Sequence, residues 1–332
     1  MEKALYYQNK PDQVVQCSLC PRECVIAPER VGVCRVRLNR DGVLYTRNYG
    51  QCSSWAVDPI EKKPLYHFFP GHDVFSIGTV GCSFRCQFCQ NWQIAQAEPV
   101  TVTLSPAEVV DYTLKVKKRN PQCIGIAYTY SEPLVWYEFV LATAKLAQAT
   151  GLKNVLVTNG YIQEKPLAEL LPYIDALNID VKGFTPEFYR RLCGGELKPV
   201  LKTAEIARQH CHVEITTLLI PGLNDTTGEL KELVAWVYSL GPETPLHFSR
   251  YYPNYKLELE PTPLATLHRA RELAKEKLYY VYLGNVIGDE HSSTFCPQCR
   301  HLLIRRSGYH VELVGLRGRT CATCGREIEV II

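Results

Sequence analysis

The chain has 332 residues, of which 46% are hydrophobic and 21% are charged, and its formal net charge is +3. This length suffices for one large domain with one or two small ones. The mild charge argues against a dedicated nucleic-acid-binding protein, which usually carries a strongly basic patch. The N-terminus lacks an apolar signal segment and no apolar run reaches membrane-spanning length. We therefore expect a soluble, cytoplasmic protein without a membrane partner.

Residues 1–72 form a cysteine-rich N-terminal section. The chain contains 15 cysteines, most of them in short Cys-x2-Cys or Cys-x3-Cys clusters. Without a secretory signal, such clusters predict metal ligation and not a disulfide framework. Four thiolates complete the coordination of a metal, so this section predicts either a structural zinc or a second iron–sulfur cluster that supplies electrons. The four ligands are Cys17, Cys20, Cys24 and Cys34. The prolines that follow predict an irregular connection over residues 58–68.

Three closely spaced cysteines, Cys82, Cys86 and Cys89, follow a strand predicted at residues 73–80. An iron–sulfur cubane usually takes four thiolates, so a local set of three leaves one iron open for chemistry. A zinc knuckle is the alternative, although zinc usually needs a fourth ligand nearby. The Cys-x3-Cys-x2-Cys spacing, with Phe88 before the last cysteine, resembles the radical S-adenosylmethionine (SAM) superfamily. This resemblance implies a 4Fe–4S cluster that binds SAM and cleaves it reductively to a 5′-deoxyadenosyl radical.

Strand-like and helix-like runs alternate from residue 73 to about residue 286. Helix start signals lie between the strands: Ser105 to Glu108 forms a capping box, and Thr262-Pro263 repeats the opening. Such alternation predicts βαβ units on a parallel sheet. The strands are predicted at residues 73–80, 124–130, 154–160, 176–183, 212–220, 245–252 and 279–286.

Polar residues at period two favour a barrel over an open sheet. Asn178, Asp180 and Lys182 alternate with Ile179 and Val181, whereas a strand covered on both faces should be almost entirely apolar. Charged side chains near the end of a buried strand fit a lumen that holds a ligand. Six β/α repeats and a trailing strand are fewer than a full barrel contains. We therefore predict an α/β fold with a partial (β/α)6 TIM-like barrel at residues 73–288.

The last section, residues 289–332, contains two Cys-x2-Cys pairs. This spacing predicts a zinc-ribbon-like module, with short strands at residues 302–306 and 309–314. Its arginines form a solvated face or a nucleic-acid surface, and we expect the former. The pairs are Cys296 with Cys299 and Cys321 with Cys324. Single cysteines such as Cys193 predict only buried apolar side chains.

Further positions at strand ends resemble the SAM-binding pattern of activating enzymes for glycyl-radical enzymes. Ser131-Glu132 lies where those relatives receive the SAM ammonium, although Tyr130 and Ser131 replace two glycines. By the same resemblance Lys182 meets the SAM carboxylate and His247 lies near the ribose. Thr158 and Asp180 lie where some relatives hold a monovalent cation, which is in doubt because Val157 replaces an acid.

A narrower resemblance covers nearly the whole chain. The opening Cys-x2-Cys-Pro-Arg-x-Cys motif, residues 58–68, Cys-Gln-Asn after the cluster loop, Tyr-x-Glu-Pro and the terminal ribbon are together similar to the radical SAM member of the AmmeMemoRadiSam system. This implies Memo and AMMECR homologues as possible partners and a flavodoxin-like or ferredoxin-like electron donor. We thus expect an enzyme that abstracts hydrogen from an unknown substrate. The alternatives are an activase that acts on a partner protein and a non-enzymatic scaffold that binds metal or nucleic acid.

Overall fold

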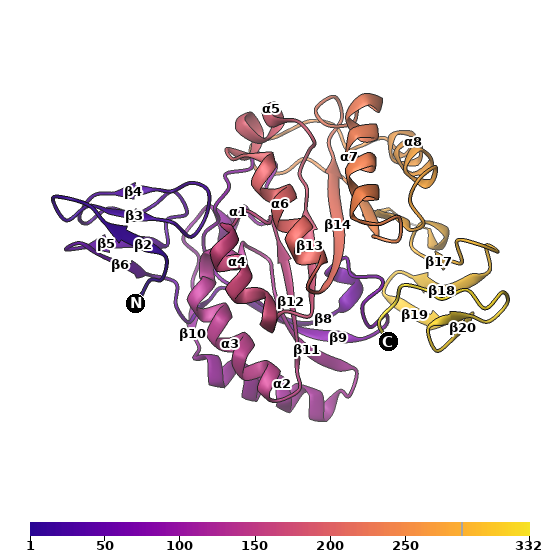
Figure 1. Cartoon of the computed structure of the whole chain (residues 1–332), viewed down its shortest axis with the longest axis horizontal. Helices are drawn as coiled ribbons and strands as arrows, with labels where there is room; N and C mark the ends of the chain where they lie inside the picture. Colours follow the sequence, from indigo (N-terminus) through magenta and orange to yellow (C-terminus); the bar gives the residue numbers. More distant parts are fainter. Residues whose placement is uncertain (287) are drawn as a thin grey trace.

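The computed structural model describes residues 1–286 and 288–332 (Figure 1). The N-terminal section folds into two small antiparallel sheets, one of order β1-β6-β5 and one of order β2-β3-β4. They project from the body of the molecule beside the N-terminus (Figure 1). Their strands are β1 (Glu2–Lys3), β2 (Tyr7–Asn9), β3 (Val15–Cys17), β4 (Val25–Ile26), β5 (Arg37–Arg40) and β6 (Val43–Thr46). A further strand, β7 (Gln51–Cys52), pairs with β10 (Val102–Thr103).

An eight-stranded sheet of order β16-β15-β14-β13-β12-β11-β9-β8 forms the centre. All neighbours from β9 to β16 are parallel, and β8 pairs antiparallel with β9. The described residues place β8 and β16 at opposite edges without a pairing between them, so the barrel is partial, as predicted. The strands are β8 (Ser54–Pro59), β9 (Asp73–Gly78), β11 (Cys123–Tyr128), β12 (Lys153–Thr158), β13 (Ala176–Asp180), β14 (His212–Leu219), β15 (Leu246–Arg250) and β16 (Val281–Gly284).

The strands predicted between residues 73 and 286 are all present, whereas β8 was not expected. Its residues were assigned to the N-terminal section and partly to an irregular connection. Pro59 ends β8 at the sheet edge, where a missing N–H costs no ladder hydrogen bond. The following segment continues into the 3-10 helix η1 (Ile60–Lys62).

Helices connect the parallel strands and lie against the sheet (Figure 1). Ser105 and Glu108 form the predicted capping box of the first crossover helix. Thr262 was expected to open α8 in the same way, but its hydroxyl donates to the Leu219 carbonyl and accepts from the Tyr251 amide, so the helix begins at Leu264 without a side-chain cap. The helices are α1 (Trp92–Ala95), α2 (Pro106–Arg119), α3 (Tyr137–Ala149), α4 (Glu164–Leu170), α5 (Pro186–Phe188), α6 (Leu197–Arg208), α7 (Thr227–Leu240) and α8 (Leu264–Lys275).

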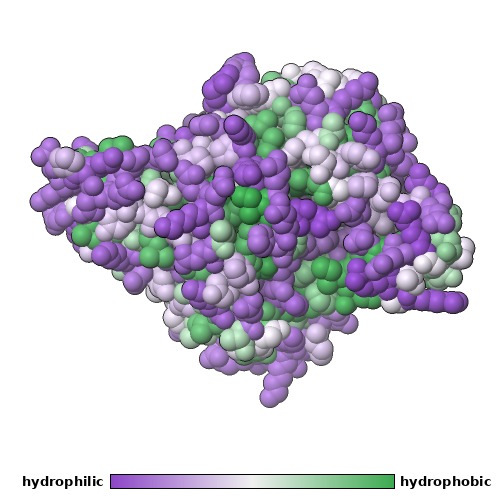
Figure 2. All heavy atoms as spheres, in the orientation of Figure 1, coloured by the Kyte–Doolittle hydropathy of each residue, from purple (hydrophilic) through white to green (hydrophobic). Residues whose placement is uncertain are grey.

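Hydrophilic residues dominate the face shown in Figure 2, with hydrophobic side chains in small groups. None of the helices formed by the described residues combines the length and the apolar character needed for a bilayer span.

The C-terminal ribbon packs against the barrel beside the C-terminus (Figure 1). Buried Arg306 on β18 reaches Glu61 of η1, and Phe68 forms a parallel bridge with Ile331. The predicted ribbon strands are present, together with short additional ones. The strands are β17 (Thr294–Phe295), β18 (Leu302–Ser307), β19 (His310–Leu313), β20 (Leu316–Arg317) and β21 (Thr320–Cys321).

Candidate functional site

A cavity of about 620 Å³ opens at the carboxyl ends of the parallel strands. Its volume is in the usual range for small-molecule sites, and strand ends are where α/β barrels carry their chemistry. The structure brings together here nearly all the site residues predicted in the barrel. They are Cys82, Cys86, Phe88, Cys89, Ser131, Glu132, Thr158, Asp180 and Lys182.

The cysteine loop leaves the end of β9 and is held in place by backbone contacts. The Arg85 amide donates to the Cys193 carbonyl at 2.8 Å. Gly81, with φ of +88°, begins the loop, and a Cβ there would lie 2.7 Å from the carbonyl oxygen of Cys34. Only glycine tolerates both this backbone conformation and this approach. The loop therefore lies directly against the N-terminal cysteine section.

Two residues beside this loop were missed in the sequence. Asn159 donates its side-chain amide to Cys82 Sγ at 3.5 Å and to Ser83 Oγ at 3.1 Å. The thiol of Cys193 lies beside Cys86 and, together with burial, raises the pKa of Cys86. Asn159 directly follows Thr158 at the end of β12, and this position was its only sequence signal. Hydrogen bonds to cysteine sulfurs tune the potential of a bound cluster.

Glu132 is buried at the cavity wall and accepts three hydrogen bonds. Thr158 Oγ1 donates at 2.6 Å, the Asn159 amide at 2.8 Å and the Leu134 amide at 3.0 Å. Burial nevertheless raises the pKa of Glu132 to about 7, against the opposing effect of these donors and of Lys182. A cation that enters the cavity favours the ionised form of this carboxyl group and so lowers its pKa.

Lys182 and Asp180 form an ion pair at the end of β13, with Nζ and Oδ2 2.6 Å apart. Burial lowers the pKa of the Lys182 ammonium, but the Asp180 charge outweighs this effect and raises it above its ordinary value. Lys182 is therefore a permanent cation that faces the cavity.

The structure does not bring His247 into this cavity, since it is not among the described residues that line it. Ser249, two residues further along β15, lines the cavity, so His247 points to the same side one layer deeper. His247 Nε2 lies 2.6 Å from Glu214 Oε2, and its ring packs edge-on against Tyr66 at 4.7 Å. These contacts satisfy its imidazole below the lining of the cavity.

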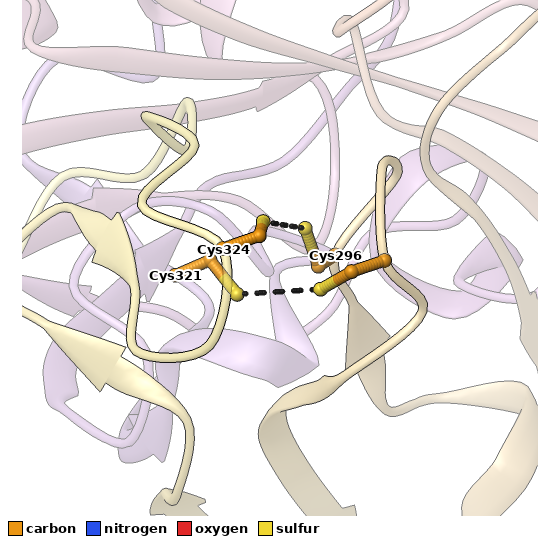
Figure 3. A group of neighbouring side chains, drawn as sticks. Cys296, Cys321 and Cys324 are labelled. Carbon is orange, nitrogen blue, oxygen red and sulfur yellow. Dashed lines mark hydrogen bonds between the residues drawn. The ribbon is translucent and has the colours of Figure 1, made fainter.

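The four cysteines of the ribbon bring their sulfurs into one compact group, and Figure 3 labels three of these cysteines. The sulfurs of Cys296 and Cys324 are 3.6 Å apart, as are those of Cys299 and Cys321, and all four lie within 4.8 Å of one another. This group fits one metal ion. The four N-terminal cysteines line a separate small cavity together with Ser83 of the cluster loop.

Fold and site together define an α/β-barrel enzyme with three cysteines and several charged side chains grouped at its strand ends. Residues 76–237 match the family described as the Radical SAM superfamily. An uncharacterized protein of Methanocaldococcus jannaschii is 44% identical over 341 residues and covers 100% of both chains. A pyruvate formate-lyase-activating enzyme of Listeria monocytogenes is 25% identical over 194 residues, which are 51% of this chain and 76% of that enzyme. The chain belongs to the radical SAM superfamily.

Solved structures agree with this fold. A radical SAM methyltransferase from Sphaerobacter thermophilus superposes with a TM-score of 0.52 at 13% identity, over 64% of this chain and 66% of that one. SuiB from Streptococcus suis, bound to S-adenosylmethionine, superposes with a TM-score of 0.51 at 14% identity, over 68% of this chain and 53% of SuiB.

Proposed function

We propose that the protein cleaves SAM reductively and uses the resulting radical to abstract a hydrogen atom from a substrate. The observation that carries this proposal is the meeting of three kinds of group in one cavity: the three-thiol loop, the buried Glu132 carboxyl and the Lys182 ammonium. A methionine moiety presents an ammonium and a carboxylate, so one acceptor and one cation are its complement.

The site residues fit a cluster and SAM as follows. Cys82, Cys86 and Cys89 would hold the cluster, and the cavity beside them leaves room for a further ligand. When bound, the 4Fe–4S cluster supplies the electron that cleaves SAM to the 5′-deoxyadenosyl radical. Glu132 receives the SAM ammonium and Lys182 its carboxylate.

The remaining lining residues support these contacts. Thr158 and Asn159 orient the Glu132 carboxyl through their hydrogen bonds. Phe84, Phe88 and Leu218 supply apolar wall that limits access of water to the reacting atoms. We propose that His247, one layer below the cavity-lining Ser249, lies near the SAM ribose without lining the cavity.

The outer cysteine sets take different roles in this proposal. The 3.6 Å sulfur separations in the ribbon match a tetrahedral ion with zinc–sulfur bonds of about 2.3 Å, for which sulfurs lie about 3.8 Å apart. We therefore assign zinc to the ribbon. The N-terminal set touches the cluster loop, where Arg22 Nε donates to the Ser83 carbonyl at 2.8 Å. Zinc and a second iron–sulfur cluster are the two candidates for that set, and Mössbauer spectroscopy with metal analysis distinguishes them.

We propose three sections, residues 1–72, 73–288 and 289–332, of which the first also supplies edge strand β8 to the sheet of the second. Residue 287, near the second boundary, lies outside the described residues. A flavodoxin-like or ferredoxin-like protein supplies electrons, and Memo and AMMECR homologues are candidate partners. An activase role toward a partner protein is the second candidate, favoured by the relatives named as pyruvate formate-lyase-activating enzymes. Mixing with such a partner and looking for a glycyl radical by EPR tests that role.

The test of the main proposal is the formation of 5′-deoxyadenosine. Anaerobically reconstituted protein with dithionite and SAM should form it, whereas a Cys82→Ala, Cys86→Ala, Cys89→Ala variant should not. Equal yields from the two proteins would contradict the proposal. The Lys182→Met variant should retain the iron–sulfur absorbance but bind SAM more weakly.

A further inference from the structure

A second group of charged side chains lines the same cavity, apart from the residues that we assign to the cluster and SAM. Lys62 ends η1 and Lys63 follows it, and both line the cavity. Tyr130, after β11, lines it beside them. All three contact Asp58 of β8. We call Asp58, Lys62, Lys63 and Tyr130 the lysine wall.

The lysine wall carries an excess positive charge. One carboxylate, that of Asp58, serves both ammonium groups: Lys62 Nζ and Lys63 Nζ each lie 2.7 Å from one of its oxygens. The Tyr130 hydroxyl also donates to Asp58 at 2.6 Å. Two cations against one anion leave a net charge of about +1. Burial lowers the pKa of Lys63, whereas Asp58 raises that of Lys62 and the two lysines lower that of Asp58 against the effect of burial.

Both ammonium groups have N–H donors that Asp58 does not use. An ammonium group has three N–H donors, and in the described part of the chain each of these two lysines uses one, on Asp58. The Lys62 side chain is 46% exposed. Lys63 Nζ also lies 4.7 Å from the centre of the Tyr130 ring, and this cation–π contact holds the ammonium group in place. Tyr309, from the turn between β18 and β19, lines the cavity as well.

Tyr130 has a strained backbone with φ of +68°. Tyrosine seldom adopts this conformation, which glycine adopts freely. The resemblance to activating enzymes places glycine here, so the chain keeps a conformation suited to glycine while carrying a large side chain. Strain of this kind concentrates at functional sites. The tyrosine ring and hydroxyl form part of the lysine wall, through Lys63 and Asp58.

The other charged groups that line the cavity are already paired or assigned. Lys182 pairs with Asp180 and is the candidate partner of the SAM carboxylate, and Glu132 is that of the SAM ammonium. We propose that the lysine wall binds an anionic group of the substrate, a carboxylate or a phosphate, with Lys62 as its principal partner. That the bound molecule is a substrate rests on the radical SAM activity proposed above, whereas the binding of an anion does not.

Calorimetric titration of the reconstituted protein tests this assignment. SAM is present throughout so that Lys182 is engaged, and the probes are inorganic phosphate and malonate at low ionic strength. We expect at least one of them to bind, and Lys62→Gln to weaken its affinity about tenfold, since a hydrogen bond to a charged group contributes about that factor. Whichever ion binds more tightly identifies the anionic group of the substrate as phosphate or carboxylate.

A matched control and a variant of opposite effect guard against misfolding. Lys153→Gln removes a lysine that pairs with Asp175 at 2.9 Å on the surface, and it should leave ion affinity unchanged. Asp58→Asn removes the competing carboxylate and should tighten ion binding several-fold, which a damaged fold does not produce. Failure of both ions to bind, or equal affinities in Lys62→Gln and Lys153→Gln, overturns the proposal.

The same samples separate this proposal from the proposed function. Formation of 5′-deoxyadenosine without ion binding would remove the lysine wall site and leave the radical chemistry standing. Ion binding that depends on Lys62, without 5′-deoxyadenosine, would support the anion site and contradict the radical SAM activity.

Discussion

Replacement of Arg306 by methionine should weaken the attachment of the C-terminal ribbon to the barrel. The Arg306 side chain is fully buried, and its Nε lies 3.4 Å from Glu61 Oε1 on η1. Its other nitrogens donate to the Tyr66 carbonyl at 2.5 Å and to Thr294 Oγ1 at 2.8 Å, and the guanidinium lies 4.4 Å from the centre of the Tyr66 ring. This one side chain thus joins the ribbon to the segment that carries Lys62.

The expected loss of stability follows from the charge left behind. Glu61 is 1% exposed at its side chain, and burial already raises its pKa although Arg306 opposes this effect. Breaking a buried pair by removing one partner costs about 3–5 kcal/mol. The 3.4 Å contact is long, so we expect about 3 kcal/mol, a large part of a typical domain stability of about 5–15 kcal/mol.

Urea unfolding of the zinc-loaded protein under reducing conditions measures this loss. The control is Arg305→Met on the same strand, which removes a surface pair with Glu312 and should cost less than about 1 kcal/mol. Combining Arg306→Met with Glu61→Gln should restore part of the stability, because no unpaired charge remains. Equal unfolding midpoints for Arg306→Met and Arg305→Met would refute the reasoning. Hydrogen exchange in β18 should rise selectively in Arg306→Met.

Three further predictions concern the cysteine sites and Glu132. In the SAM-free folded protein Glu132 has a pKa of about 7, whereas in the unfolded chain its pKa is 4.5. Between these pH values the folded protein keeps a proton on Glu132 that the unfolded chain releases. The contribution of Glu132 to the free energy of unfolding therefore falls by about 3 kcal/mol as pH rises from 4.5 to about 7. The measurement is the difference in pH-dependent stability between the protein and its Glu132→Gln variant. This difference is needed because buried His67, with its pKa lowered to about 4, makes stability rise with pH. Asn159→Ala removes a donor to Cys82 and should lower the cluster potential by about 40 mV in an EPR-monitored titration, the equivalent of about 1 kcal/mol; an unchanged potential would contradict the contact. Cys324→Ser should lose one zinc per chain by metal analysis and melt earlier, and retention of the zinc would rule out the assigned ligand set.

Much of the fold could be predicted from the sequence because the patterns that indicate its strands and helices are local. The alternation of polar and apolar residues over 176–183 predicts a strand from a few residues alone. The capping box from Ser105 to Glu108 predicts a helix start in the same way. Cysteine spacing is equally local, so each metal loop could be recognised. Strand β8 was not predicted, because its place at the sheet edge, where Pro59 is tolerated, depends on pairing with β9.

The sequence by itself determined the class of fold, the three cysteine sets and the strand ends that carry Glu132 and Lys182, since each is a pattern within one segment. Only the tertiary structure decided depth and proximity. It buried His247 against Glu214, 33 residues away, and set Asn159 beside Cys82, 77 residues away. It also placed Lys62 and Lys63 at the cavity, where Asp58 meets Tyr130 across 72 residues. Such contacts depend on how the chain closes long loops and stacks layers, which no local pattern specifies.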